Sequence, residues 1–251
     1  MSGSFPTLPR PPIVEAVVDF DCDLPPGFDL KALGESAREK FADLYPSMLP
    51  RLMQELRLQI GTDGPSDPLT SHGLEAFVFS QSDRKQLVQV RRSGFSFNRL
   101  SPYTGLDVYL AEVQRVWRLY CEIARPIRVR TLRLRYINRI DVPLTGGQVD
   151  LDKYLTLQNM LVDDQHMTLT GFLSQYSAVE RETGHQVSVI LTAQNPEGDK
   201  LPIIFDNAAA ANVELDPADW QGLSQTLTAL RDLKNRVFFG TVKQPCLDLF
   251  Q

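Results

Sequence analysis

The stretch from residue 131 to residue 143, TLRLRYINRIDVP, most constrains the fold, because apolar and charged side chains alternate along it. Successive side chains of a β-strand point to opposite faces of a sheet. The even-numbered positions are apolar except for Asn138, and the odd-numbered positions carry three arginines. We therefore expect a long strand in an antiparallel sheet that is covered on one face only. The three arginines are Arg133, Arg135 and Arg139.

Apolar periodicity places the other elements. The pattern predicts, in chain order, a strand over 13–22, a helix over 29–44, strands over 52–61, 74–81 and 85–100, and a helix over 106–124. The second part of the chain contains the strand that ends at Pro143, a short helix over 151–155, three strands within 167–211 and a long helix opened by Asp216 and Pro217. Thr104 has the position of an N-cap before the first long helix.

This order predicts an α+β fold in which a β-α-β-β-β-α unit occurs twice. We expect an extended proline-rich arm over 1–12 and one domain over 13–251, with half-repeats over 13–125 and 126–251. Antiparallel strands with the two long helices on one face would bury the apolar stripes of both helices. Helix-grip folds and the TATA-binding-protein fold share this order of elements, which is an analogy of topology and implies no function.

Charge is distributed unevenly along the chain. The formal net charge is −5, yet the segment from Arg84 to Arg139 holds 13 basic and three acidic residues. Such a segment either pairs with acidic residues of the same chain or of a second copy, or it forms a surface for anions. Because the whole chain is acidic, nucleic-acid binding is the less favoured prediction, although it is not excluded.

Several function classes lack their sequence signals. No apolar run has the length of a membrane span, and the N-terminus has no apolar run typical of a signal peptide. The three cysteines and three histidines have no zinc-ligand spacing, and the chain contains no GxSxG, P-loop, GxGxxG or HExxH motif. We therefore expect a cytoplasmic protein without membrane association, and we predict no catalytic, cofactor-binding or metal-binding residue.

Two segments with similar sequences are the candidate binding residues. FNRL and INRI each place an Asn-Arg pair near the end of a predicted strand. Asparagine also suits strand-end turns for structural reasons, so the pairs either stabilise the strand ends or form one rim that binds a partner. Arginine can hold a carboxylate or a phosphate through two parallel hydrogen bonds. The candidates are Asn98, Arg99, Arg133, Arg135, Asn138 and Arg139.

Three segments carry a family resemblance. PPIVEAVVDF, FSFNRLSPYTGLDVY and LRYINRIDVP, in that order, resemble a sporadically distributed family of bacterial proteins of about this length, to which no activity is assigned. The resemblance covers nearly the whole chain, and the Asn-Arg segments are its most specific part. The chain departs from the pattern at Leu106, where the family commonly has a tryptophan. The resemblance implies a bacterial protein and supplies no catalytic residue.

The favoured function is therefore that of a non-enzymatic binding, assembly or regulatory accessory protein that acts as a homodimer, with another protein as a further possible partner. The alternative is a phosphate-, nucleotide- or nucleic-acid-binding protein, or an enzyme, that uses the arginine-bearing strand. In the first class the guanidinium groups of the strand form ion pairs with carboxylates of the protein. In the second class they bind an external anion.

Overall fold

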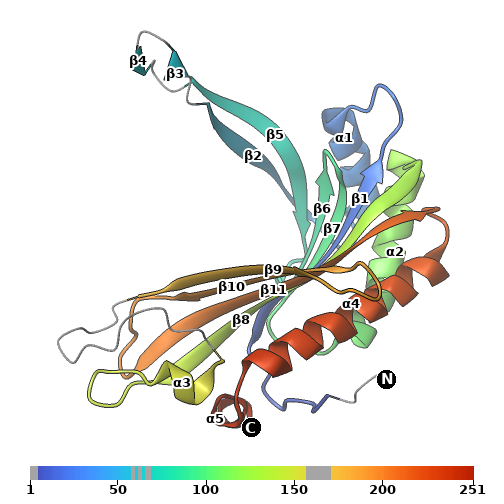
Figure 1. Cartoon of the computed structure of the whole chain (residues 1–251). Helices are drawn as coiled ribbons and strands as arrows, with labels where there is room; N and C mark the ends of the chain where they lie inside the picture. Colours follow the sequence, from blue (N-terminus) through green and yellow to red (C-terminus); the bar gives the residue numbers. More distant parts are fainter. Residues whose placement is uncertain (1–4, 58–59, 62–63, 66–68, 157–170) are drawn as a thin grey trace.

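The computed structural model describes residues 5–57, 60–61, 64–65, 69–156 and 171–251, and within them one large antiparallel sheet carries helices. Its nine strands have the order β2-β5-β6-β7-β1-β8-β11-β10-β9, and β3 and β4 form a separate small pair. Figure 1 shows β2 and β5 leaving the rest of the sheet as a long two-stranded ribbon. The strands are β1 Ile13–Asp23, β2 Ser47–Arg57, β3 Ile60–Gly61, β4 Gly64–Pro65, β5 Leu69–Ser80, β6 Gln86–Arg91, β7 Gly94–Leu100, β8 Arg128–Pro143, β9 Leu173–Val179, β10 Gln186–Ala193 and β11 Lys200–Leu215. The helices are α1 Leu30–Phe41, α2 Leu106–Ala124, α3 Leu151–Tyr154, α4 Trp220–Thr241 and α5 Gln244–Leu247, followed by the 3-10 helix η1 Asp248–Phe250.

Strands β1 and β8 pair with each other near the centre of the sheet. β1 also pairs with β7, the last strand before α2, and β8 pairs with β11, the last strand before α4. The remaining strands extend outward from these pairs in comparable orders, β6-β5-β2 on one side and β10-β9 on the other. The hydrogen-bonded sheet is therefore continuous from the first part of the chain to the second.

The alternation along β8 has the predicted result. The even-numbered residues from Leu132 to Val142 are each at most 2% exposed, including Asn138. The odd-numbered residues lie on the opposite face and are partly or fully exposed. We call the face that carries Arg133 and Arg135 the open face, and the opposite face the helix face. The predicted core face of residues 131–143 is confirmed.

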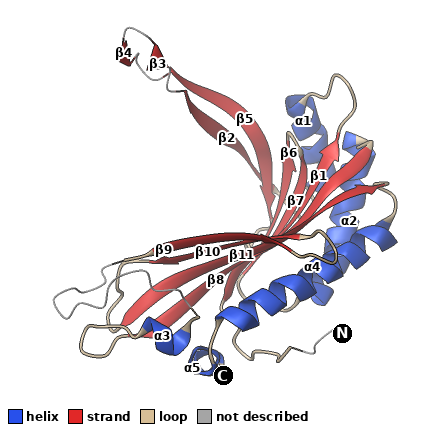
Figure 2. Ribbon diagram, viewed as in Figure 1, coloured by secondary structure: helices blue, strands red, loops and turns tan. Residues whose placement is uncertain are grey.

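Aromatic packing joins the sheet to α2 and to α4. The ring of Phe20 on β1 stacks on Trp117 of α2, with a centroid separation of 4.5 Å. Phe205 of β11 stacks on Phe238 of α4 at 5.4 Å. The indole N–H of Trp117 donates to the carbonyl of Pro217, just before α4, which links the two helical regions. Figure 2 shows α2 and α4 on the same side of the strands in this view.

The predicted strand over 85–100 is wrong, because it is two strands, β6 and β7, joined by a tight turn. Gly94 follows the turn with φ of +141°, a conformation that glycine adopts without a steric penalty. A Cβ atom there would lie 2.1 Å from the carbonyl oxygen of Phe20. The turn residues Arg92 and Ser93 interrupt an apolar pattern that otherwise runs through both strands. The first part of the chain therefore contributes five strands to the large sheet, one more than predicted.

Two helix starts also differ from the sequence-based expectation. Thr104 does not cap α2, because the N-cap is Gly105 and makes no side-chain capping hydrogen bond. α4 begins at Trp220, and its N-cap is Asp219, whose side chain accepts from the N–H of Gly222. Asp216 lies in the turn before the helix, where its carboxylate accepts from a backbone N–H. Both differences are of a few residues and leave the apolar stripes in register.

Candidate functional site

Two of the predicted arginines meet carboxylates of the same chain on the open face. Arg135 donates from Nε and Nη2 to the two carboxylate oxygens of Asp206, at 2.8 and 2.5 Å. Arg139 donates to Asp141 at 2.9 Å and to Glu197 at 2.6 Å. These hydrogen bonds raise the pKa of both guanidinium groups. The two arginines therefore have internal counter-ions in the folded chain.

Arg133 differs from its neighbours on β8. Its side chain is exposed, and no carboxylate of the described residues lies within ion-pair distance of it. It lines a shallow surface hollow of about 440 Å³ with Ser177 of β9, Ser188 of β10 and Ala208 of β11. Of the three predicted arginines, Arg133 is the one whose guanidinium group is available to an external anion.

The asparagines of the two Asn-Arg pairs point to opposite faces of the sheet. Asn98 lies on the open face, where it accepts from Gln89 at 2.8 Å and donates to Glu15 at 2.6 Å. Asn138 lies on the helix face and donates to the carbonyl of Phe205 at 2.9 Å. Arg99 lies next to Asn98 along β7 and therefore shares the helix face with Asn138. The similar segments do not form one rim, and both asparagines are buried with hydrogen-bond partners.

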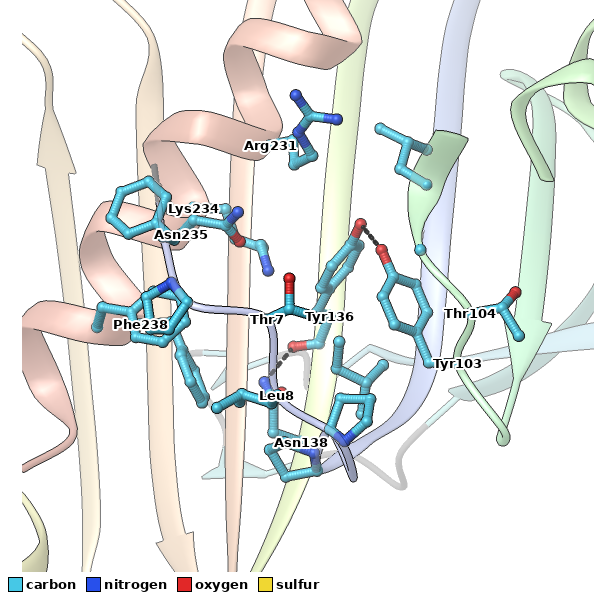
Figure 3. Close-up of a pocket in the computed structure, with 18 of the residues that line it drawn as sticks. Thr7, Leu8, Tyr103, Thr104, Tyr136, Asn138, Arg231, Lys234, Asn235 and Phe238 are labelled. Carbon is cyan, nitrogen blue, oxygen red and sulfur yellow. Dashed lines mark hydrogen bonds between the residues drawn. The ribbon is translucent and has the colours of Figure 1, made fainter. Parts of the chain in front are cut away.

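A pocket of about 550 Å³ opens on the helix face, between the start of α2, the middle of β8, α4 and the N-terminal arm. Figure 3 shows Leu8 of the arm, Tyr103 before α2, Tyr136 and Asn138 of β8, and Phe238 of α4 arranged around it. Most of the lining is aromatic, aliphatic or proline. Pockets that bind small molecules have this size and this mixture of apolar walls with a few polar groups.

Lys234 of α4 is the most unusual side chain of this pocket. It is 4% exposed, and its Nζ lies 3.6 Å from the centroid of the Tyr136 ring. Among the described residues, no carboxylate forms an ion pair with Nζ and no acceptor forms a hydrogen bond with it. Burial, with the charge of Arg231 as the second cause, holds the pKa of Lys234 well below its usual value. Buried lysines of this kind are more frequent at functional sites than in ordinary cores.

The hydroxyl groups of three tyrosines lie close together between α2 and β8, and two of these residues, Tyr103 and Tyr136, line the pocket. The hydroxyl groups of Tyr103 and Tyr136 lie 2.5 Å apart, and the hydroxyl of Tyr109 lies 3.5 Å from that of Tyr136. Burial is the main cause that raises the pKa of all three phenols. They are therefore neutral hydrogen-bonding groups at physiological pH.

The mouth of the pocket carries one arginine that is already paired. Arg231 donates from Nη1 to both carboxylate oxygens of Asp107 at 3.1 Å and from Nε to Asp232 at 3.3 Å. Asp107 lies in the first turn of α2 and is largely exposed. Of the two cations in the pocket, only Lys234 lacks a facing carboxylate among the described residues.

The sequence-based search missed Lys234, although a signal was present. Leu223, Leu227, Leu230 and Phe238 recur at steps of three or four residues along α4, and Lys234 lies in the same series. A charged residue within the apolar stripe of a helix predicts a buried charge. The predicted site residues followed the density of arginine, which marks exposed positions on β8. Asn138 is the one predicted residue that lines the pocket.

Comparisons with known proteins leave the family open. No protein-family model matches the chain, and no curated sequence is significantly similar to it. The resemblance to the sporadic bacterial family stays a prediction. Within the described part of the chain, no helix combines the length and the apolar content needed to cross a bilayer.

Proposed function

We propose that the chain is a binding protein of a bacterial accessory or regulatory system, and that it holds a small molecule in the pocket between the arm, α2, β8 and α4. The observation that carries this proposal is the buried Lys234, which lines the pocket without a counter-ion among the described residues. The aromatic side chains of the lining would remove part of a ligand's apolar surface from water, which is the main source of affinity in such pockets. The favoured class remains non-enzymatic binding.

The test is to fill the pocket without changing its charges. Leu8 is a partly buried arm residue that packs against the core, and a Leu8→Trp substitution would place a larger ring in the cavity. Ligands found by thermal-shift screening of small organic molecules should raise the melting temperature of the wild type by mass action. The shift should disappear in Leu8→Trp. The matched control is Ile127→Trp, an exposed residue between α2 and β8 outside the pocket. A ligand whose shift persists in Leu8→Trp binds elsewhere, which would contradict the proposal.

We also propose self-association through the open face as a second candidate function, in accord with the predicted homodimer. Both outer strands of the sheet carry exposed apolar side chains on this face, which are Leu49 on β2 and Leu173 and Val179 on β9. Exposed apolar side chains that gather on one face favour a protein interface. Light scattering at two protein concentrations tests it. A mass that stays at 28.3 kDa would contradict it, and Leu173→Ser with Val179→Ser should abolish any dimer.

We infer that the two parts of the chain, over 13–125 and 126–251, derive from one duplicated unit and form a single α+β domain with both long helices on one face. The strand orders on either side of the β1–β8 pair support this inference. So does Tyr136, whose hydroxyl lies near Tyr109 of α2 and whose ring lies under Lys234 of α4. A fragment over 1–125 that folds alone, with the melting cooperativity of the whole chain, would contradict the single domain.

A further inference from the structure

We propose that the ligand of this pocket is an apolar or aromatic molecule with a single negative charge, and that this charge pairs with the Nζ of Lys234. The inference rests on the proposed function and deepens it, because it names the chemical class of the ligand. It follows from the charges, the walls and the helix end that surround the pocket.

The charges of the described lining residues indicate one anionic group. Arg231 is neutralised by Asp107 and Asp232, so that Lys234 is the one cation left without a facing carboxylate among them. A polyphosphate would bring several negative charges next to Asp107 and Asp232, and like charges repel. A single carboxylate or sulfonate would add only one negative charge and would pair it with the ammonium group of Lys234. Nucleotides are therefore the wrong class for this pocket.

The start of α2 also favours a negatively charged group on the ligand. Gly105 and Leu106 line the pocket, and the N-cap makes no side-chain hydrogen bond that would satisfy the first N–H groups of this 19-residue helix. The N-terminus of a helix attracts negative charge through these N–H groups and the helix dipole. Together with the buried ammonium group opposite, it favours an anion inside the pocket.

The walls define the rest of the ligand. Phe5 of the arm stacks on Phe239 of α4 at 5.2 Å, and Leu8 and Phe238 complete an apolar side. The rings of Tyr103 and Tyr136 form the opposite side. Aromatic walls prefer flat apolar ligands, because offset stacking adds to the effect of burial. The ligand therefore carries an aromatic or other apolar body beside its anionic group.

Binding of such a ligand is coupled to a proton. Burial lowers the pKa of Lys234, and an anion beside Nζ would raise it again. The other titratable groups that face the pocket are Arg231, Asp232, Asp107, Tyr103 and Tyr136. The described arm residues that line the pocket carry no ionisable side chain. An anion beside Nζ therefore favours the protonated form of Lys234.

Two dyes with the same aromatic scaffold test the inference. Anilinonaphthalene sulfonate carries one negative charge, and phenylnaphthylamine is its neutral counterpart. Both fluoresce more strongly in apolar pockets. Titration of the full chain should show saturable binding of both dyes, with the sulfonate the tighter. Lys234→Met should weaken the binding of the sulfonate by about tenfold or more, because one charge-assisted hydrogen bond is lost. The dissociation constant of the neutral dye should change by less than about twofold.

The matched control is Arg133→Met, which removes an exposed cation from the open face. It should change neither affinity. Equal binding of the two dyes, or a sulfonate affinity that depends on Arg133 rather than on Lys234, would overturn the inference but leave the pocket as a ligand site. Absence of saturable binding by either dye would overturn both the inference and the proposed function.

Discussion

The buried amine of Lys234 makes a specific prediction about stability. We consider the substitution Lys234→Met, which keeps the length of the side chain and removes its charge. In the folded chain Nζ has the Tyr136 ring beside it at 3.6 Å and no carboxylate among the described residues. A cation over an aromatic ring gains about 2 kcal/mol at most in such contacts, whereas the desolvation of an unpaired ammonium costs several. The methionine variant should therefore be more stable than the wild type at neutral pH.

The dependence on pH distinguishes this account from a simple packing effect. The pKa of Lys234 is lower in the folded state than in the unfolded state, so the unfolded chain binds one proton more between the two values. The free energy of unfolding of the wild type should then rise with pH relative to the variant. The slope is about 1.4 kcal/mol per pH unit, and the rise ends near the unfolded lysine pKa of about 10.4. Below the folded pKa both states hold the proton and the difference becomes constant.

Urea unfolding of both proteins at pH 8.5 and 9.5 measures this difference. All other groups contribute equally to the two proteins, so they cancel in the comparison. The gain is at most about 1.4 kcal/mol, which corresponds to at most roughly 3–6 °C in melting temperature for a chain of this size. Parallel stability curves over this interval would refute the reasoning, because they would mean that Lys234 stays charged when the chain folds.

Three further substitutions test other parts of the account. Arg135→Gln leaves the carboxylate of Asp206 without its two charge-assisted hydrogen bonds and should cost about 1–3 kcal/mol in urea unfolding, with most of the loss recovered when Asp206→Asn is added. Gly94→Ala forces a Cβ into the backbone of β1 at a positive φ and should lower the unfolding free energy by more than about 1 kcal/mol; an unchanged midpoint would contradict the close approach. Asp107→Asn removes a counter-ion from Arg231 and should tighten anilinonaphthalene sulfonate binding severalfold, whereas unchanged affinity would argue against the charge balance of the pocket.

The periodic elements could be predicted because their signals are local. Alternation along β8 placed Leu134 and Tyr136 in the core and Arg135 on the other face, and the structure agrees. The partner of Arg135 was not predictable in the same way. Asp206 is 71 residues away, and it faces Arg135 through the pairing of β8 with β11. A single sequence contains no direct record of which strands become neighbours.

The similar sequences of the two Asn-Arg segments wrongly suggested a common surface. The apolar residues of each strand predict the face on which its asparagine lies. Asn98 alternates with Phe97, which is fully buried on the helix face, so Asn98 must face the other way. Asn138 shares its face with Tyr136 and therefore points toward the helices. The orientation of each asparagine follows from the apolar residues of its own strand. The Asn-Arg dipeptide that both segments share does not determine it.

The pocket itself was beyond sequence reasoning, because it is assembled from four segments that are distant in the chain. The arm over 5–13, the residues from Tyr103 to Asp107, the middle of β8 and the second half of α4 meet only in the folded molecule. Lys234 could have been recognised as a buried charge on α4, but its neighbours could not. The arginine-rich composition of β8 instead predicted a site on the open face of the sheet.

A crystal structure of the protein with anilinonaphthalene sulfonate tests the central claim most directly. We predict density for the dye in the pocket of the helix face, with its aromatic rings between Tyr136 and Phe238 and its sulfonate within hydrogen-bond distance of the Nζ of Lys234. Density for the dye beside Arg133 on the open face, with the pocket of the helix face empty, would contradict the account.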